Sequence, residues 1–130
     1  SDKRKAINLL SNLVKNDSEN VNAYLQLGNL LRDEDTERAI KIHQMLTVRQ
    51  NLQKETKIEI LKSLALDYEQ INDLVKARAE SEKILEIDKL NLWANLFLLS
   101  LAEKSNDWDY AEQKARDLSK ISAYKDKINF

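Results

Sequence analysis

An internal repeat of about 34 residues constrains the fold of this chain more than any other sequence feature. Four similar segments place an alanine at successive offsets of 33, 38 and 34 residues: Ala6, Ala39, Ala77 and Ala111. A period of this length is typical of proteins in which one supersecondary unit stacks on the next. One unit cannot bury its apolar face alone, so we expect residues 1–130 to form a single continuous domain.

Each repeating unit is predicted to be a pair of α-helices. The chain contains no Pro and a single Gly, Gly28, and apolar residues recur at three- and four-residue steps, as in Leu61, Leu64, Ala65 and Tyr68. Residues that cap helices or tolerate turns interrupt this pattern at 16–20, 33–36, 50–54, 72–73, 88–91 and 105–107. We therefore predict an all-α chain of about seven helices and no β-structure.

The spacing from Leu27 and Gly28 to Ala39, with an acidic turn between them, resembles the tetratricopeptide repeat (TPR). The resemblance implies a right-handed solenoid of antiparallel helical hairpins, in which small residues let paired helices approach closely. It divides the chain into the second helix of an incomplete repeat (1–17) and repeats at 21–53, 58–91 and 92–125, a fragment of a longer protein. The first full hairpin has a turn one residue short, about four extra residues follow at 53–57, and no repeat ends in Pro.

Composition and charge argue against several classes of function. Lys and Arg number 21 against 22 Asp and Glu, so the chain has no general attraction for nucleic acid or an anionic membrane surface. No Cys is present, which excludes disulfides and thiolate chemistry and is typical of a reducing, cytoplasmic compartment. His43 is the single His and has apolar neighbours, so we expect it to pack between helices rather than bind metal. No pattern identifies a catalytic group, a cofactor site or a metal site, which leaves an enzyme as the least supported alternative.

The resemblance to TPR proteins also implies a concave face, formed by the first helices of successive repeats, that binds a protein or peptide. Apolar residues on this face are expected to take an apolar side chain of the partner, and Arg32 and Lys62 to orient an acidic group. The predicted contact residues are Asn22, Leu25, Asn29, Arg32, Glu59, Lys62, Leu66, Glu69, Trp93, Leu96, Ser100 and Glu103.

Separate interpretations apply to Trp93, Trp108 and Asn29. Trp93 either faces the partner or packs against the preceding hairpin or the neighbouring turn. Trp108 is expected to be structural, because the repeat places a bulky residue in the tight turn there. Asn29 matches a carboxylate-binding Asn of TPR domains that hold chaperone tails, but Leu25 stands where those domains need Lys. We therefore do not expect a chaperone-tail clamp.

Residues 24–31 and 37–44, including the sequence Ile-His-Gln, resemble more narrowly a family of bacterial regulators of lipopolysaccharide assembly. This resemblance implies an adaptor on the cytoplasmic side of the inner membrane, tethered through a segment outside this chain. It also implies two partners, the lipid A pathway deacetylase and a membrane protease that degrades it. The alternatives are a TPR adaptor for another protein and a segment used mainly for self-association.

Overall fold

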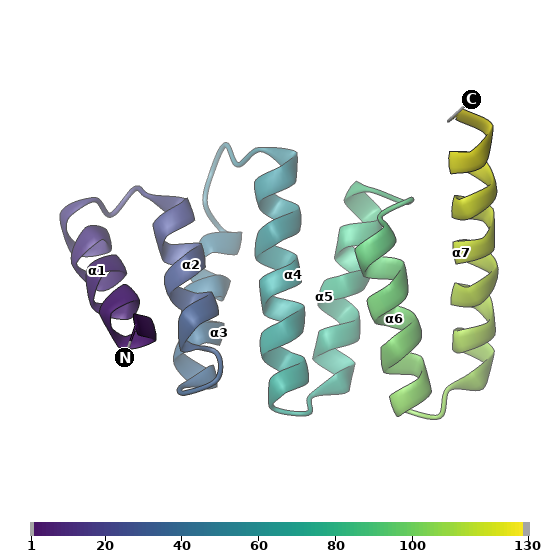
Figure 1. Ribbon diagram of the computed structural model, residues 1–130, viewed down its shortest axis with the longest axis horizontal. Coiled ribbons are helices and arrows are strands. Elements are labelled where there is room, and N and C mark those ends of the chain that lie inside the picture. The colour runs from purple at the N-terminus through teal and green to yellow at the C-terminus, as the bar shows by residue number, and fades with distance from the viewer. Residues whose placement is uncertain (1, 129–130) are drawn as a thin grey trace.

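The computed structural model describes residues 2–128, and within them every regular element is an α-helix (Figure 1). The helices are α1 (Asp2–Asn16), α2 (Val21–Leu31), α3 (Thr36–Thr47), α4 (Lys54–Gln70), α5 (Leu74–Ile87), α6 (Leu92–Lys104) and α7 (Trp108–Ile128). The prediction of an all-α chain of seven helices is thus confirmed for the described residues. Residues 1, 129 and 130 of the predicted domain lie outside them.

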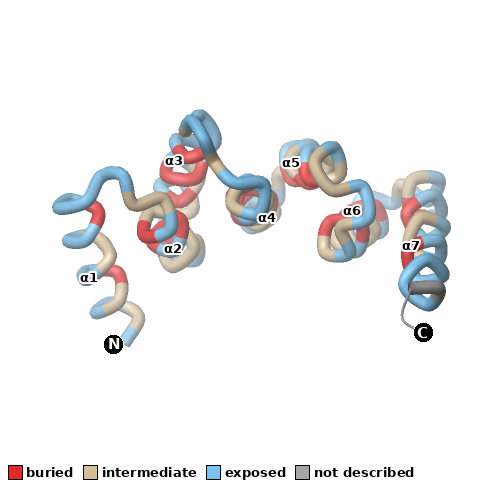
Figure 2. Tube along the Cα trace, turned by 90° about the horizontal axis from the view of Figure 1, so that it is seen from above, coloured by how far each residue is buried: buried red, intermediate tan, exposed pale blue. Residues whose placement is uncertain are grey.

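The helices form a solenoid of antiparallel hairpins, α2 with α3, α4 with α5, and α6 with α7. Each helix packs on its neighbours in chain order, and α2 also contacts α4. Viewed from above, α3 and α5 lie on one side of the layer and α2 and α6 on the other, while α1 and α7 occupy the two ends (Figure 2). The first helix of each hairpin therefore contributes to one face, as the repeat pattern predicts.

Short polar side chains explain where most helices begin. Each accepts a hydrogen bond from the backbone N–H three residues later, at 2.9 Å for α2 and α6 and at 3.1 to 3.3 Å for α3, α5 and α7. The capping residues are Asn20, Asp35, Asp73, Asn91 and Asp107. They lie in the predicted breaks of the apolar pattern, which is why the sequence alone located the helix boundaries closely.

The second and third hairpins share one turn geometry. Asn72 and Asn106 have φ of 60° and 57°, a left-handed conformation that Asn tolerates well. After each of them an aspartate N–H reaches back 2.9 Å to a carbonyl five residues earlier, which closes a Schellman motif. The first hairpin lacks a left-handed residue, and Arg32 stays right-handed at φ −50° and ψ −46°. The first hairpin, whose spacing from Gly28 to Ala39 is one residue shorter, therefore turns with a different backbone geometry.

The extra residues after the first hairpin lengthen α4. This helix begins at Lys54, one turn before the predicted repeat boundary at 58, and no side chain caps its start at Gln53. Residues 48–53 connect α3 to α4. The division of the chain into repeats stays a prediction. The extra residues at 53–57 lie at the start of α4.

Small residues at the hairpin contacts are fully enclosed, with Ala39, Ala65 and Ala77 each 0% exposed. Gly28 is the tightest of these positions, because a Cβ built on it would lie 2.8 and 2.9 Å from the Cε1 and Cδ2 atoms of the His43 ring. His43 is itself 0% exposed, which confirms that it packs between helices. The contact between α2 and α3 therefore depends on a residue without a side chain.

Candidate functional site

The predicted contact residues fall on one face of α2, α4 and α6, because they recur at alternating three- and four-residue steps. Their exposure differs widely. Four are exposed: Asn22, Glu59, Leu96 and Glu103. Seven are partly buried: Asn29, Arg32, Lys62, Leu66, Glu69, Trp93 and Ser100. Leu25 is 5% exposed and belongs to the core, which corrects the expectation that its side chain is open to a partner.

A cavity of about 340 Å³ lies between α2 and α4 on this face. It brings together the predicted residues Asn22, Leu25 and Glu59, and it adds Glu55 from the first turn of α4. Glu55 precedes the predicted repeat boundary at 58, so it is not among the predicted contact residues. Two carboxylates at one opening give this part of the face an acidic character, so it suits a basic group of a partner better than an acidic one.

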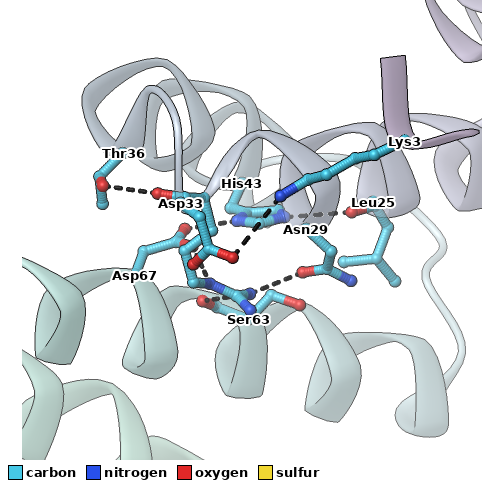
Figure 3. Close-up of polar contacts among 9 residues, drawn as sticks. Lys3, Leu25, Asn29, Asp33, Thr36, His43, Ser63 and Asp67 are labelled. Atoms are coloured by element: carbon cyan, nitrogen blue, oxygen red, sulfur yellow. Dashed lines mark hydrogen bonds and ion pairs between the residues drawn. The ribbon is translucent and has the colours of Figure 1, made fainter. Parts of the chain in front are cut away.

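Arg32 does not point to a partner, because its guanidinium is held by Asn29, Ser63 and Asp67, which are labelled in Figure 3. Nε donates to Asp67 Oδ1 at 2.8 Å and Nη2 donates to Asn29 Oδ1 at 2.7 Å. Nη2 also lies 3.4 Å from the carbonyl oxygen of Ser63. These bonds tie the end of α2 to α4, and they correct the expectation that Arg32 orients an acidic group of the partner.

Asp67 is the centre of this network, although it is not among the predicted contact residues. Its side chain is 0% exposed, and Oδ2 lies 2.5 Å from Nδ1 of His43. The other ring nitrogen of His43, Nε2, lies 3.2 Å from the carbonyl oxygen of Leu25. The sequence contains an indication of this role, because Asp67 stands between Leu64 and Tyr68 on the apolar stripe of its helix. A carboxylate at such a buried position must have partners.

Trp93 packs against neighbouring side chains instead of being freely open to a partner. Its ring stacks on Phe97 with centroids 4.7 Å apart and planes 13° apart. The Lys62 ammonium lies 5.1 Å from the centre of the Trp93 ring, which joins α4 to α6. Glu69 and Lys104 pair across the same two helices at 2.7 Å. Several predicted contact residues therefore hold successive first helices together.

The most open apolar side chain on the predicted face is Leu96, 49% exposed. Ser100 follows it by four residues on α6 and is partly buried, as is Leu66 on α4. Trp108, in contrast, is 61% exposed at the start of α7, so the expectation of a structural, packed role for it is wrong. The face thus combines an acidic cavity between α2 and α4 with an apolar position on α6.

Within residues 2–128, His, Cys, Asp and Glu do not gather in groups of three or more that could hold a metal ion. No helix of the described chain combines the length and the apolar character needed to cross a bilayer.

Comparison with curated proteins finds relatives that share one name. The chain is 28% identical over 125 residues to the lipopolysaccharide assembly protein B of Escherichia coli K12, and this match covers 95% of the chain. It is 33% identical over 109 residues to the protein of the same name from Haemophilus influenzae, over 82% of the chain. The chain spans about a third of the length of these relatives, 32% and 27% respectively. The narrower resemblance seen in the sequence is confirmed.

Comparison with solved structures identifies the fold. A fragment of MamA from Desulfovibrio magneticus superposes with a TM-score of 0.76 over 99% of this chain and 70% of its own, at 14% sequence identity. This similarity supports the TPR-like solenoid and carries no information about partners. No protein-family model matches the chain.

Proposed function

We propose, from the similarity to lipopolysaccharide assembly protein B, that this solenoid is a non-catalytic scaffold that binds proteins in the regulation of lipopolysaccharide assembly. The similarity extends over nearly the whole chain rather than over one hairpin, and this observation carries the proposal. A stack of hairpins that presents one continuous face of first helices is a common platform for extended partners.

The proposed binding face runs from the cavity between α2 and α4 to Leu96 on α6. Glu55 and Glu59 favour a basic side chain of the partner at the cavity, where Asn22 adds a polar contact. Leu96 and Leu66 favour an apolar side chain further along. A partner segment with a basic residue followed by an apolar residue fits this arrangement better than the acidic segment expected from the sequence.

A more specific proposal concerns the identity of the partners. By its resemblance to lipopolysaccharide-assembly regulators, the scaffold brings the lipid A pathway deacetylase to a membrane protease and so promotes its degradation. A segment outside this chain tethers it to the inner membrane, on the cytoplasmic side. This chain then supplies recognition alone, and the protease supplies the bond cleavage.

Binding to the purified deacetylase and to the protease, both from the organism that encodes this chain, tests the proposal directly. Biolayer interferometry compares the wild-type chain with a Glu59→Lys, Leu96→Asp variant. Both substitutions are on exposed positions, so circular dichroism should show unchanged helix content. We expect the wild type to bind at least one of the two proteins, and the variant to bind it about tenfold or more weakly.

A control variant, Glu86→Lys with Val48→Asp, changes exposed residues on α5 and at the end of α3 and should bind as the wild type does. If both variants bind equally well, the contact lies outside the proposed face. If the wild type binds neither protein, the partner assignment is overturned and a TPR adaptor for a different protein takes its place.

Self-association is a second candidate function, and one observation favours it. Leu9 and Leu13 lie four residues apart on α1 and are 71% and 42% exposed, so they form an apolar stripe on the end of the solenoid. Sedimentation velocity over a range of concentrations distinguishes a monomer from a dimer, and a Leu9→Lys, Leu13→Lys variant should abolish any dimer formed through this stripe.

A further inference from the structure

A second and larger cavity lies between α5, α6 and α7, and it shares no lining residue with the proposed binding face. Its volume is about 480 Å³, within the range of small-ligand pockets. Asn95 lines it from α6, and Leu85 and Ile121 line it from α5 and α7. Asn95 follows Trp93 by two residues, which places it about 200° further around the helix axis. The cavity is therefore separate from the face that carries Leu96.

The preceding repeat shows what this space looks like when it is filled. Leu61 and Ile87 stand 34 residues before Asn95 and Ile121, and they line an equivalent cavity of only about 110 Å³. Leu61 is a buried apolar side chain, whereas Asn95 is a polar amide that is 2% exposed and donates to the carbonyl oxygen of Asn91 at 2.9 Å. The larger opening thus coincides with a polar residue where the preceding repeat has leucine.

Two of the helices that flank the cavity, α5 and α7, contact each other near the start of α7. The Arg78 guanidinium lies 3.6 Å from the centre of the Tyr110 ring, and the Tyr110 hydroxyl donates to Glu82 at 3.0 Å. Burial and the neighbouring Glu82 raise the pKa of Tyr110 above its usual range, so the hydroxyl keeps the proton that it donates. These bonds connect α5 and α7 near Tyr110, and the cavity opens where Leu85 and Ile121 line the same two helices farther along.

Positive charge gathers at the cavity although the whole chain has a net charge of −1. Three lysines line it and one aspartate opposes them. Lys114 is 8% exposed and pairs with Asp117 at 3.1 Å. Among the side chains that the structure describes, none forms an ion pair with the two exposed lysines, Lys89 and Lys120. Two ammonium groups without counter-charges at one opening favour an anion between them.

We propose that this cavity is a second binding site, which takes an acidic side chain of a peptide together with an adjacent apolar side chain. Lys89 and Lys120 pair with the carboxylate at the opening, and the apolar side chain packs on Leu85 and Ile121. Lysines supply point charges that suit one carboxylate. The cavity is independent of the binding face on α2, α4 and α6, so it adds a contact that the proposed function does not require.

The experiment uses two capped tripeptides, acetyl-Leu-Glu-Leu-amide and its glutamine analogue, titrated into the ¹⁵N-labelled chain. We expect saturable shifts of amide signals in 85–95 and 113–121 with the glutamate peptide. The glutamine analogue should bind about tenfold more weakly, since it loses its charge-assisted hydrogen bonds. Inorganic phosphate, added as a competitor, should displace the peptide poorly because it has no apolar group for Leu85 and Ile121.

Two variants test the site, one by removing positive charge and the other by filling the cavity. Lys89→Gln with Lys120→Gln removes exposed charges and cannot disturb the core, and it should weaken binding of the glutamate peptide about tenfold or more. Asn95→Leu copies Leu61 of the preceding repeat and should close the cavity and abolish binding. Lys57→Gln is the matched control, because Lys57 lines the smaller equivalent cavity, and it should leave binding unchanged.

The proposal is overturned if the glutamate peptide produces no saturable shifts, or if the glutamine analogue binds equally well. It is also overturned if phosphate displaces the glutamate peptide efficiently, since the site then recognises any anion. The Leu96→Asp variant separates the two proposals, because it should impair the binding face of the proposed function and leave this titration unchanged.

Discussion

Gly28 lies against the His43 ring, so replacing this one residue tests how closely α2 and α3 must pack. Alanine is favoured over glycine in a helix interior by about 1 kcal/mol. At this site its Cβ would force the ring away from Asp67 and Leu25, with overpacking of about 1–3 kcal/mol and strained hydrogen bonds in addition. We expect Gly28→Ala to lower the free energy of unfolding by about 2 kcal/mol in urea titrations.

Gln26→Ala is the control for this change, because Gln26 is exposed on the same helix and its replacement should alter stability by less than about 0.5 kcal/mol. A neutral or stabilising Gly28→Ala would mean that the ring moves aside at little cost. The double variant Gly28→Ala, His43→Ala should cost less than the sum of the two single changes, since the ring is no longer there to be displaced.

Asp67 is the second residue whose environment makes a sharp prediction. It is fully buried and accepts from Arg32 while lying beside His43, so its removal leaves two basic groups without their partner. We expect Asp67→Asn to destabilise the chain by about 3–5 kcal/mol, measured by chemical unfolding. Glu69→Gln makes the same chemical change two residues later, in an exposed pair with Lys104, and should cost less than about 1 kcal/mol. Similar losses in both variants would refute a special role for Asp67.

At the scale of the helix, α4 differs from its counterparts in how it begins. Gln53 has the extended conformation of a capping residue, φ −66° and ψ 153°, but makes no side-chain cap bond. Asp in this position should accept from the N–H of Thr56, as the other caps do from theirs. We expect Gln53→Asp to raise the unfolding free energy by about 1 kcal/mol. Gln53→Ala should leave it unchanged, and an equal gain from both changes would show that capping is not the cause.

At the scale of the whole molecule, stability should be graded along the solenoid. In a stack of repeats each helix depends on its neighbours, and α4 contacts α2, α3 and α5 while α1 contacts α2. Hydrogen exchange followed by NMR should therefore find the slowest amides in α4. Those in α1 should exchange more than tenfold faster, a difference of about 1.4 kcal/mol. Uniform protection across the helices would indicate that the chain unfolds as one cooperative unit.

The sequence by itself determined the elements and their order. Helix propensity, apolar steps of three and four, and capping residues such as Asp35 and Asp73 act over a few neighbouring positions, so they can be read without the fold. The recurring alanines likewise predicted the stacking, because their small size is needed wherever two helices approach closely. The packing of His43 followed from its apolar neighbours on one helix.

Tertiary structure alone decided which side chains are available to a partner. Arg32 and Asp67 are 35 residues apart, and their ion pair exists only because α2 packs on α4. The same holds for Lys62 against Trp93, and for the burial of Leu25 by the surrounding core. Periodicity assigns a residue to a face of its helix, but whether that face is open depends on long side chains of other helices. For this reason the helices were predictable from sequence, and the composition of the binding face was not.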